Sequence, residues 1–252
     1  RYIMGPEIFE LEGELAKCVG VEHCISCASG TDALSLPLMA FGAGPGDAVF
    51  TTPFTFFASP ESIALTGATP VFVDIESEHC NINSDLIEKA ITSQTTAILP
   101  VHVYGSPCNV EKIQEIADKY KLKVIYDAAH AFGHNFKGQS VLNWGDLSTL
   151  SFHATKAFST MEGGAIICHD EKTKQRIDYL KNFGFANDTE IVFPGINSKM
   201  NEMQAALGLI QLKHHHHNIK IRQELAQTYR SCLKDFSGIH LMKPPAELGN
   251  NS

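Results

Sequence analysis

Three short segments of this chain carry residue types that together could do chemistry. At residues 29–31, small and hydroxyl residues precede an apolar helix, and the free N–H groups at a helix N-terminus bind phosphate. Asp127 ends an apolar strand, and in a parallel sheet ligands lie in the crevice beyond such strand ends. Lys156 follows another apolar strand, and a desolvated lysine with a lowered pKa is a nucleophile toward carbonyl groups.

Each segment also has an ordinary structural explanation. Residues 29–31 can be a simple helix cap, Asp127 can cap the next turn, and Lys156 can be a surface lysine. In combination, however, a phosphate site, a carboxylate and a lysine on one sheet meet the needs of pyridoxal 5'-phosphate (PLP). The helix start would hold the phosphate, the carboxylate would keep the pyridine nitrogen protonated, and the lysine would form a Schiff base and later move a proton.

The elements that must position these residues follow from short apolar runs that alternate with amphipathic stretches. We expect strands over 47–52, 70–74, 97–103, 123–127, 147–152 and 164–168, and helices over 59–65, 84–91, 109–121 and 201–234. This pattern predicts a three-layer α/β fold, with a mostly parallel sheet and helices on both faces. Residues 1–235 would form this large domain. A turn and an expected strand at 239–242 would begin a small C-terminal α/β domain over 236–252.

Composition narrows the class of protein. The chain has 252 residues, of which 44% are hydrophobic, and a net charge of −8, so we expect a globular protein without a nucleic-acid groove. No apolar run is long enough to span a membrane, and the N-terminus lacks the regions of a signal peptide. An odd count of seven cysteines argues against a disulfide framework, so we expect a reducing cytoplasm. Because the chain begins at Arg1, we expect it to be a fragment.

Four other motifs are better explained without chemistry. Glycines at 42–46 precede a strand instead of following one, so they are expected to form a turn and not a dinucleotide loop. Residues 133–140 resemble a P-loop but lack its lysine. Cys24 and Cys27 are expected to be buried thiols, since no second pair completes a zinc site. The histidine run 214–217 is expected to be exposed helix or an artefact, so we predict no metal site.

Longer stretches resemble the DegT/DnrJ/StrS sugar aminotransferases, which are fold-type-I PLP enzymes. The resemblance runs from Gly5 to about Arg222. Its most specific stretches are 29–34, 52–56, 67–74, 127–130, 151–156, 162–164 and 195–206. It implies the large domain of an aspartate aminotransferase-like fold. Members of the family begin earlier than Arg1 and continue into a smaller C-terminal domain.

The same resemblance implies roles around the cofactor ring. Lys156 would carry the cofactor covalently, and Asp127 would bind the pyridine nitrogen. His130 would lie near the ring hydroxyl group. Phe56 would stack on the ring, where relatives carry an aromatic residue. Lys156 and Asp127 are therefore the predicted catalytic residues, and all four are predicted to bind the cofactor.

Phosphate binding is implied for a second set of residues. Gly30, Thr31 and Ser151 would hold the phosphate from within the chain. Asn197 resembles a residue that reaches the phosphate from the neighbouring subunit, so the resemblance implies a homodimer with shared active sites. Lys199 stands where many relatives have arginine, and this exchange loses the forked geometry of the guanidinium group.

The activity implied by the resemblance is transfer of an amino group from L-glutamate to a nucleotide-linked keto sugar. Stretches 126–133 and 181–186 resemble members that aminate C4 of dTDP-4-keto-6-deoxyglucose, in deoxyamino-sugar and surface-polysaccharide biosynthesis such as that of the O-antigen. Stretch 24–28 is closer to members that aminate C3 of UDP-linked sugars. We expect C4. The alternatives are C3 amination, a sugar dehydratase, and a regulatory or sensing protein on the PLP fold. Lys156 disfavours the dehydratase, because dehydratase members carry histidine there.

Overall fold

A computed structural model describes residues 2–242 of the chain. Its helices are α1 (Pro6–Val19), α2 (Gly30–Phe41), α3 (Ala58–Leu65), α4 (Ser84–Ala90), α5 (Val110–Tyr120), α6 (Glu171–Leu180) and α7 (Glu202–Leu233), with short 3₁₀ turns η1 (Val103–Gly105) and η2 (Val141–Asn143). The strands of the main sheet are β1 (His23–Cys27), β2 (Ala48–Thr51), β3 (Thr69–Phe72), β4 (Thr95–Ile98), β5 (Lys123–Asp127), β8 (Leu147–Ser151) and β9 (Gly164–Cys168). A small hairpin joins β6 (Asn135–Phe136) to β7 (Gln139–Ser140).

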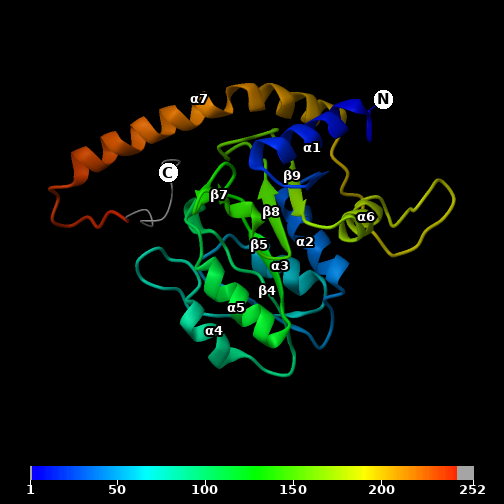
Figure 1. Cartoon of the computed structure of the whole chain (residues 1–252), viewed down its shortest axis with the longest axis horizontal. Helices are drawn as coiled ribbons and strands as arrows, with labels where there is room; N and C mark the ends of the chain where they lie inside the picture. The colour runs from blue at the N-terminus through cyan, green and yellow to red at the C-terminus, as the bar shows by residue number, and fades with distance from the viewer. Residues whose placement is uncertain (1, 243–252) are drawn as a thin grey trace.

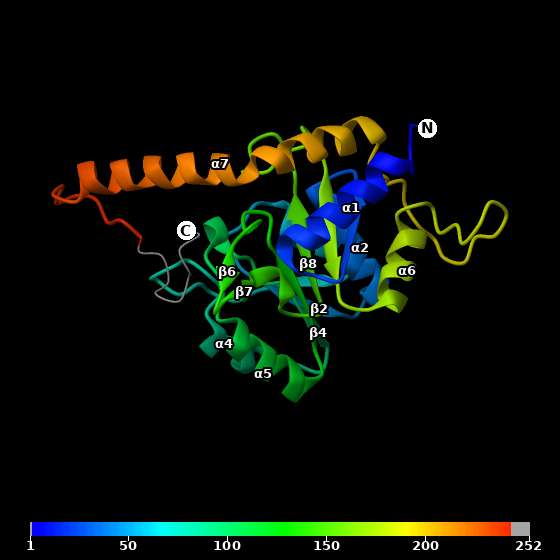
Figure 2. The ribbon, with the colours of Figure 1, turned by 45° about the horizontal axis from the view of Figure 1, so that its top comes forward.

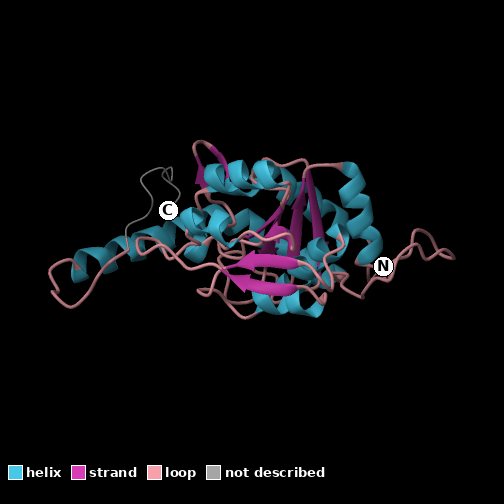
Figure 3. Ribbon diagram, turned by 90° about the horizontal axis from the view of Figure 1, so that it is seen from below, coloured by secondary structure: helices cyan, strands magenta, loops and turns pink. Residues whose placement is uncertain are grey.

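The main sheet has seven strands in the order β1-β9-β8-β5-β4-β2-β3. Pairing is parallel from β8 through β5, β4 and β2 to β3, whereas β9 is antiparallel to both of its neighbours, β8 and β1. Helices cover both faces, with α1, α7, α4 and α5 on one side and α2, α3 and α6 on the other (Figures 1 and 3). The predicted three-layer, mostly parallel α/β fold is therefore confirmed.

Strand β5 illustrates why the sheet is buried on both faces. Val124 and Tyr126 pack under α5, while Ile125 between them packs on the opposite side against α2 and α3. Successive side chains of a strand point to opposite faces, so a strand with helices on both sides is a continuous apolar run. Asp127 is the first charged residue of that run after Lys123, and it stands at the carboxyl end.

Helices α1 and α7 cross the same face of the molecule and are joined through Glu202 (Figure 2). The carboxylate of Glu202 accepts the N–H groups of Gly5 and Glu7, which are otherwise unpaired at the start of α1. Further along, a Cβ atom on Gly208 would lie 2.9 Å from the Leu11 side chain. An interior glycine thus allows the close approach of the two helices.

Several predicted elements differ from those observed. The strand expected over 97–103 ends at Ile98, because Pro100 has no N–H group for the ladder and only Val101 still bridges to Asp127. The strand expected at 239–242 is not observed, since these four residues have no regular secondary structure. Most of the expected C-terminal domain lies outside the described residues, so its boundary stays a prediction. Within residues 2–242, no helix combines the length and apolarity needed to cross a membrane.

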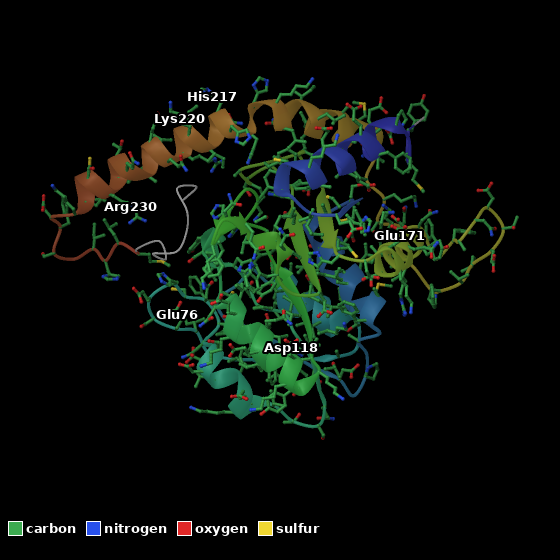
Figure 4. The ribbon with its side chains drawn as sticks, in the orientation of Figure 1. Glu76, Asp118, Glu171, His217, Lys220 and Arg230 are labelled. Carbon is green, nitrogen blue, oxygen red and sulfur yellow. The ribbon has the colours of Figure 1, made fainter. Side chains whose placement is uncertain are left out.

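The histidine run was expected to be exposed, and this prediction was wrong for one residue. His215 is buried, whereas His214, His216 and His217 are exposed. The ring of His215 packs edge-on against Phe132, with the ring centroids 4.7 Å apart. Four consecutive helical positions point in different directions, so one of them faces the core. Figure 4 shows His217 on the outer side of the same helix.

Candidate active site

A cavity of about 680 Å³ lies beyond the carboxyl ends of the parallel strands, beside the N-terminus of α2. Seven predicted site residues line it, namely Gly30, Thr31, Phe56, Asp127, His130, Ser151 and Lys156. Parallel strands end at the same edge of a sheet, and therefore the structure brings together residues that are far apart in the sequence. Asn197 does not line this cavity.

Asp127 is a buried carboxylate whose two oxygens are both hydrogen-bonded. Ser59 donates its hydroxyl proton to Oδ2 at 2.7 Å, and the Ala129 N–H group donates to Oδ1 at 3.1 Å. The Ser59 hydroxyl is in turn 2.8 Å from that of Thr55. A buried charge without partners would be costly, so these donors make an ionised Asp127 tenable at the cavity wall. Sequence reasoning missed Ser59, since nothing in a short helix marks which serine faces a strand end.

Lys156 and His130 form a hydrogen-bonded pair on the cavity wall. Lys156 Nζ lies 3.0 Å from His130 Nε2, and a protonated lysine donates in this contact. Burial lowers the pKa of Lys156, although the negative charge of Asp127 opposes the shift. Burial and the lysine charge lower the pKa of His130. The histidine is therefore mainly neutral at pH 7, and the lysine loses its proton more readily than a surface lysine.

The start of α2 packs directly on the end of β8. A Cβ atom on Gly30 would lie 2.7 Å from the Ser151 Cβ, so only glycine permits this approach. Ser29 caps the helix by accepting the Asp32 N–H group with its hydroxyl oxygen. Within the described part of the chain, no hydrogen bond uses the N–H groups of Gly30 and Thr31. These two donors and the Ser151 hydroxyl make a cradle for an anionic group.

Aromatic side chains form the outer wall of the cavity. Phe56 is 81% exposed there. Tyr104, which sequence reasoning did not single out, stacks parallel to His130 with ring centroids 6.0 Å apart and meets Phe54 edge-on. Its backbone is left-handed, with φ at +51°, which is uncommon for a non-glycine residue. Gly105, which follows Tyr104, was the available signal, since glycine favours tight turns.

Asn197 lies on the surface of the same chain. Its side-chain oxygen accepts a hydrogen bond from Lys199 Nζ at 2.7 Å, and that amine also lies over the Phe183 ring. The chain therefore does not bring Asn197 to its own cavity. Its expected role in a neighbouring subunit stays a prediction.

The motifs that were set aside are consistent with structural roles. Cys24 and Cys27 are buried free thiols, as predicted, and burial raises the pKa of both. Residues 133–140 form the turn and hairpin of β6 and β7. Among residues 2–242, no cluster of three or more metal-ligating side chains occurs.

Comparisons with known proteins show what the whole chain is similar to. The model of the DegT/DnrJ/EryC1/StrS aminotransferase family matches residues 1–251. The chain is 48% identical over 247 residues to dTDP-4-amino-4,6-dideoxy-D-glucose transaminase of Shigella dysenteriae, and the match covers 98% of this chain and 67% of the relative. It is 41% identical to UDP-2-acetamido-2-deoxy-3-oxo-D-glucuronate aminotransferase of Pseudomonas aeruginosa, with 93% and 66% covered.

A solved structure gives the same picture. DesV of S. venezuelae, in complex with a ketimine intermediate, superposes with a TM-score of 0.95 at 36% identity. That match covers 99% of this chain and 67% of DesV. The chain thus spans about two thirds of the length of the proteins that it matches.

Proposed function

This chain belongs to the DegT/DnrJ/EryC1/StrS aminotransferase family, and from that premise we propose that it uses PLP to transfer an amino group from L-glutamate to a nucleotide-linked keto sugar. The observation that carries the proposal is the convergence of Asp127, Lys156 and the free N–H groups of α2 in one cavity. A carboxylate, an amine and an anion cradle are three separate requirements of this cofactor, and each comes from a different element.

The donor set of the cavity fits PLP. When bound, PLP supplies an electron-withdrawing ring and an aldehyde carbon that carries the amino group between the two substrates. Gly30, Thr31 and Ser151 would hold the phosphate of PLP. The N–H groups of Gly30 and Thr31 are free, Ser151 lines the cavity, and the positive end of the α2 dipole also attracts an anion. Asp32 lies in the first turn of the same helix, and burial raises the pKa of its carboxyl group.

Asp127 would bind the ring nitrogen and keep a proton on it. The hydrogen bonds from Ser59 and Ala129 fix the orientation of the carboxylate, so that it need not reorganise during the reaction. Phe56 and Tyr104 on the wall would cover the ring and exclude water. By its resemblance to the family, His130 would lie near the ring hydroxyl group, and in the structure it is held between Tyr104 and Lys156.

Lys156 would hold the cofactor through its Nζ atom and would move a proton at the same atom. Both tasks need the uncharged amine, and burial lowers the pKa of Lys156 in that direction. His130 accepts a hydrogen bond from Nζ and so keeps the amine pointed into the cavity. As neutral imidazole, it adds no positive charge that would repel the protonated lysine.

For the keto sugar we propose dTDP-4-keto-6-deoxyglucose, aminated at C4. The 48% identity to a dTDP-4-amino-4,6-dideoxy-D-glucose transaminase supports this choice. The second candidate is amination at C3 of a UDP-linked sugar, which the 41% identity to a UDP-3-oxo-sugar aminotransferase favours. Either product would serve the biosynthesis of surface polysaccharides such as the O-antigen.

We further propose that the active protein is a cytoplasmic homodimer in which Asn197 completes the partner's phosphate site. Large apolar side chains are exposed at the cavity and on α1 and α7, including Phe54, Phe9 and Met203, as expected of a surface that a second subunit covers. All seven cysteines are free, which suits a reducing compartment.

Loading the protein with PLP and adding L-glutamate tests the proposal directly. We expect a visible absorbance band from the bound cofactor, its loss on addition of glutamate, and amination of dTDP-4-keto-6-deoxyglucose in preference to a UDP-3-keto sugar. Lys156→Ala should retain the fold but show neither the band nor turnover. A wild-type protein that binds PLP and takes no amino group from any donor would contradict the proposal.

A further inference from the structure

A second cavity, of about 290 Å³, lies beside the first. The two cavities share six lining residues: Tyr104, Ala129, His130, Ser151, Thr155 and Lys156. The remaining walls of the second come from Phe132, Ala157, Phe158 and Arg222. Because Lys156 and His130 line both cavities, a molecule in the second cavity would meet the same amine as one in the first.

Arg222 is brought to this cavity by the way in which α7 is seated. His215 on the same helix is buried against Phe132 and Phe158, with ring centroids 4.7 Å and 6.2 Å apart. Residues seven positions apart lie on one side of an α-helix, so Arg222, although exposed, lies on the same side of α7 as His215, two turns further on, where it lines the second cavity. Both phenylalanines also line the second cavity. The two phenylalanines that contact His215 and hold α7 in place therefore also form part of the wall of the second cavity, which Arg222 lines as well.

The charge of the second cavity is positive. None of its ten lining residues is acidic, whereas Lys156 and Arg222 are cationic and His130 is kept neutral by burial and by the lysine. In the part of the chain that the structure describes, no hydrogen bond or ion pair engages the Arg222 guanidinium group. An arginine side chain offers five N–H donors in a planar fork that matches a carboxylate. The cavity thus suits a small anion whose other end reaches Lys156.

We propose that Arg222 binds a carboxylate group of the amino donor, an inference that rests on the proposed function. Small-molecule sites usually have volumes of roughly 300–1,000 Å³. At about 290 Å³ the second cavity lies at the lower limit of this range and suits a ligand as small as an acidic amino acid, and the first, of about 680 Å³, is left for the cofactor and the keto sugar. The carboxylate can be the α-carboxylate or that of the side chain, and the two make different predictions for donors without an acidic side chain.

Binding of glutarate to the cofactor-loaded protein isolates this contact, because glutarate is a dicarboxylate without an amine. Arg222→Gln should weaken glutarate binding about 10- to 100-fold by calorimetry, as expected for loss of a charged hydrogen-bonded pair. Arg222→Lys should lose less, since it keeps the charge without the fork. Lys220→Gln is the matched control: it removes a positive charge from the same helix and lines neither cavity, and Figure 4 shows Lys220 on the outer side of α7.

Single-turnover rates with L-glutamate and L-alanine then identify the carboxylate. A loss in Arg222→Gln with both donors assigns Arg222 to the α-carboxylate, and a loss with glutamate alone assigns it to the side chain. Unchanged glutarate affinity would overturn the inference, as would a loss of PLP affinity or of sugar-nucleotide affinity instead. If Arg222→Gln transaminates as fast as the wild-type protein, Arg222 has no role in donor binding. The proposed function is unaffected by that result.

Discussion

The hydrogen bond from Ser59 to Asp127 is the contact whose removal tests the site most sharply. It is 2.7 Å long, fully buried and made to a carboxylate, so it belongs to the class that contributes about 1.5–3 kcal/mol. Ser59→Ala leaves Asp127 with the Ala129 N–H group as its remaining donor. Since about 1.4 kcal/mol corresponds to a factor of ten, we expect PLP affinity and the rate with glutamate to fall together by about 10- to 150-fold.

Ser62→Ala is the matched control for this experiment. Ser62 is equally buried on the same helix, but its hydroxyl contacts Ser35, at 3.3 Å, and not Asp127. PLP affinity is measured by absorbance titration, and the rate by single turnover with glutamate. Both variants should lose similar thermal stability, whereas only Ser59→Ala should lose PLP affinity and rate. If the two variants lose PLP affinity equally, Ser59 does not act through Asp127 and the assignment of this contact is refuted.

Three further substitutions test other parts of the molecule. Glu202→Gln weakens the acceptor of two N–H groups at the start of α1, so the free energy of unfolding in urea should fall by about 1–2 kcal/mol. An unchanged free energy would show that Glu202 does not hold α1 and α7 together. Tyr104→Gly relieves a left-handed backbone and removes a cavity wall, so stability should rise by up to about 1 kcal/mol while KM for the keto sugar rises. Burial lowers the pKa of His215 from 6.5 to about 4, so the unfolded chain binds more protons and stability falls as pH drops from 6.5 to 4. His215→Leu should flatten the fall in Tm over that window, and an equally steep fall would refute this.

The residues found from sequence alone share one property, which is that a local pattern fixes where they point. Asp127 and Lys156 each follow an apolar run, and the ends of parallel strands converge whatever the loops between them do. Gly30 begins a helix behind a serine cap, so its free N–H group was also predictable. For such positions the fold class is sufficient to predict proximity, and the structure adds only distances.

Residues supplied from the interior of helices were missed for the opposite reason. Ser59 and Ser62 are both buried serines on one turn of α3, yet only Ser59 reaches Asp127, and this depends on the rotation of the helix over the sheet. The burial of His215 was not predicted, because four identical residues in a row do not indicate which of them faces the core. Helix α1 was not predicted either, although Pro6 at its start and Gly20 at its end are standard signals.

Helix α7 couples the packing of the fold to the chemistry of the site. It begins at the capping box of Asn201 and rises about 1.5 Å per residue, so Arg222 lies roughly 30 Å from the start. A helix with a mostly polar surface is not held in place by its own propensity. Its orientation therefore depends on packing, including the tie of Glu202 to the start of α1, the contact of Gly208 with α1 and that of His215 with Phe132. A bulkier residue at position 208 would tilt the helix off α1 and displace Arg222 from the second cavity, and so would weaken donor binding without touching any residue that lines it.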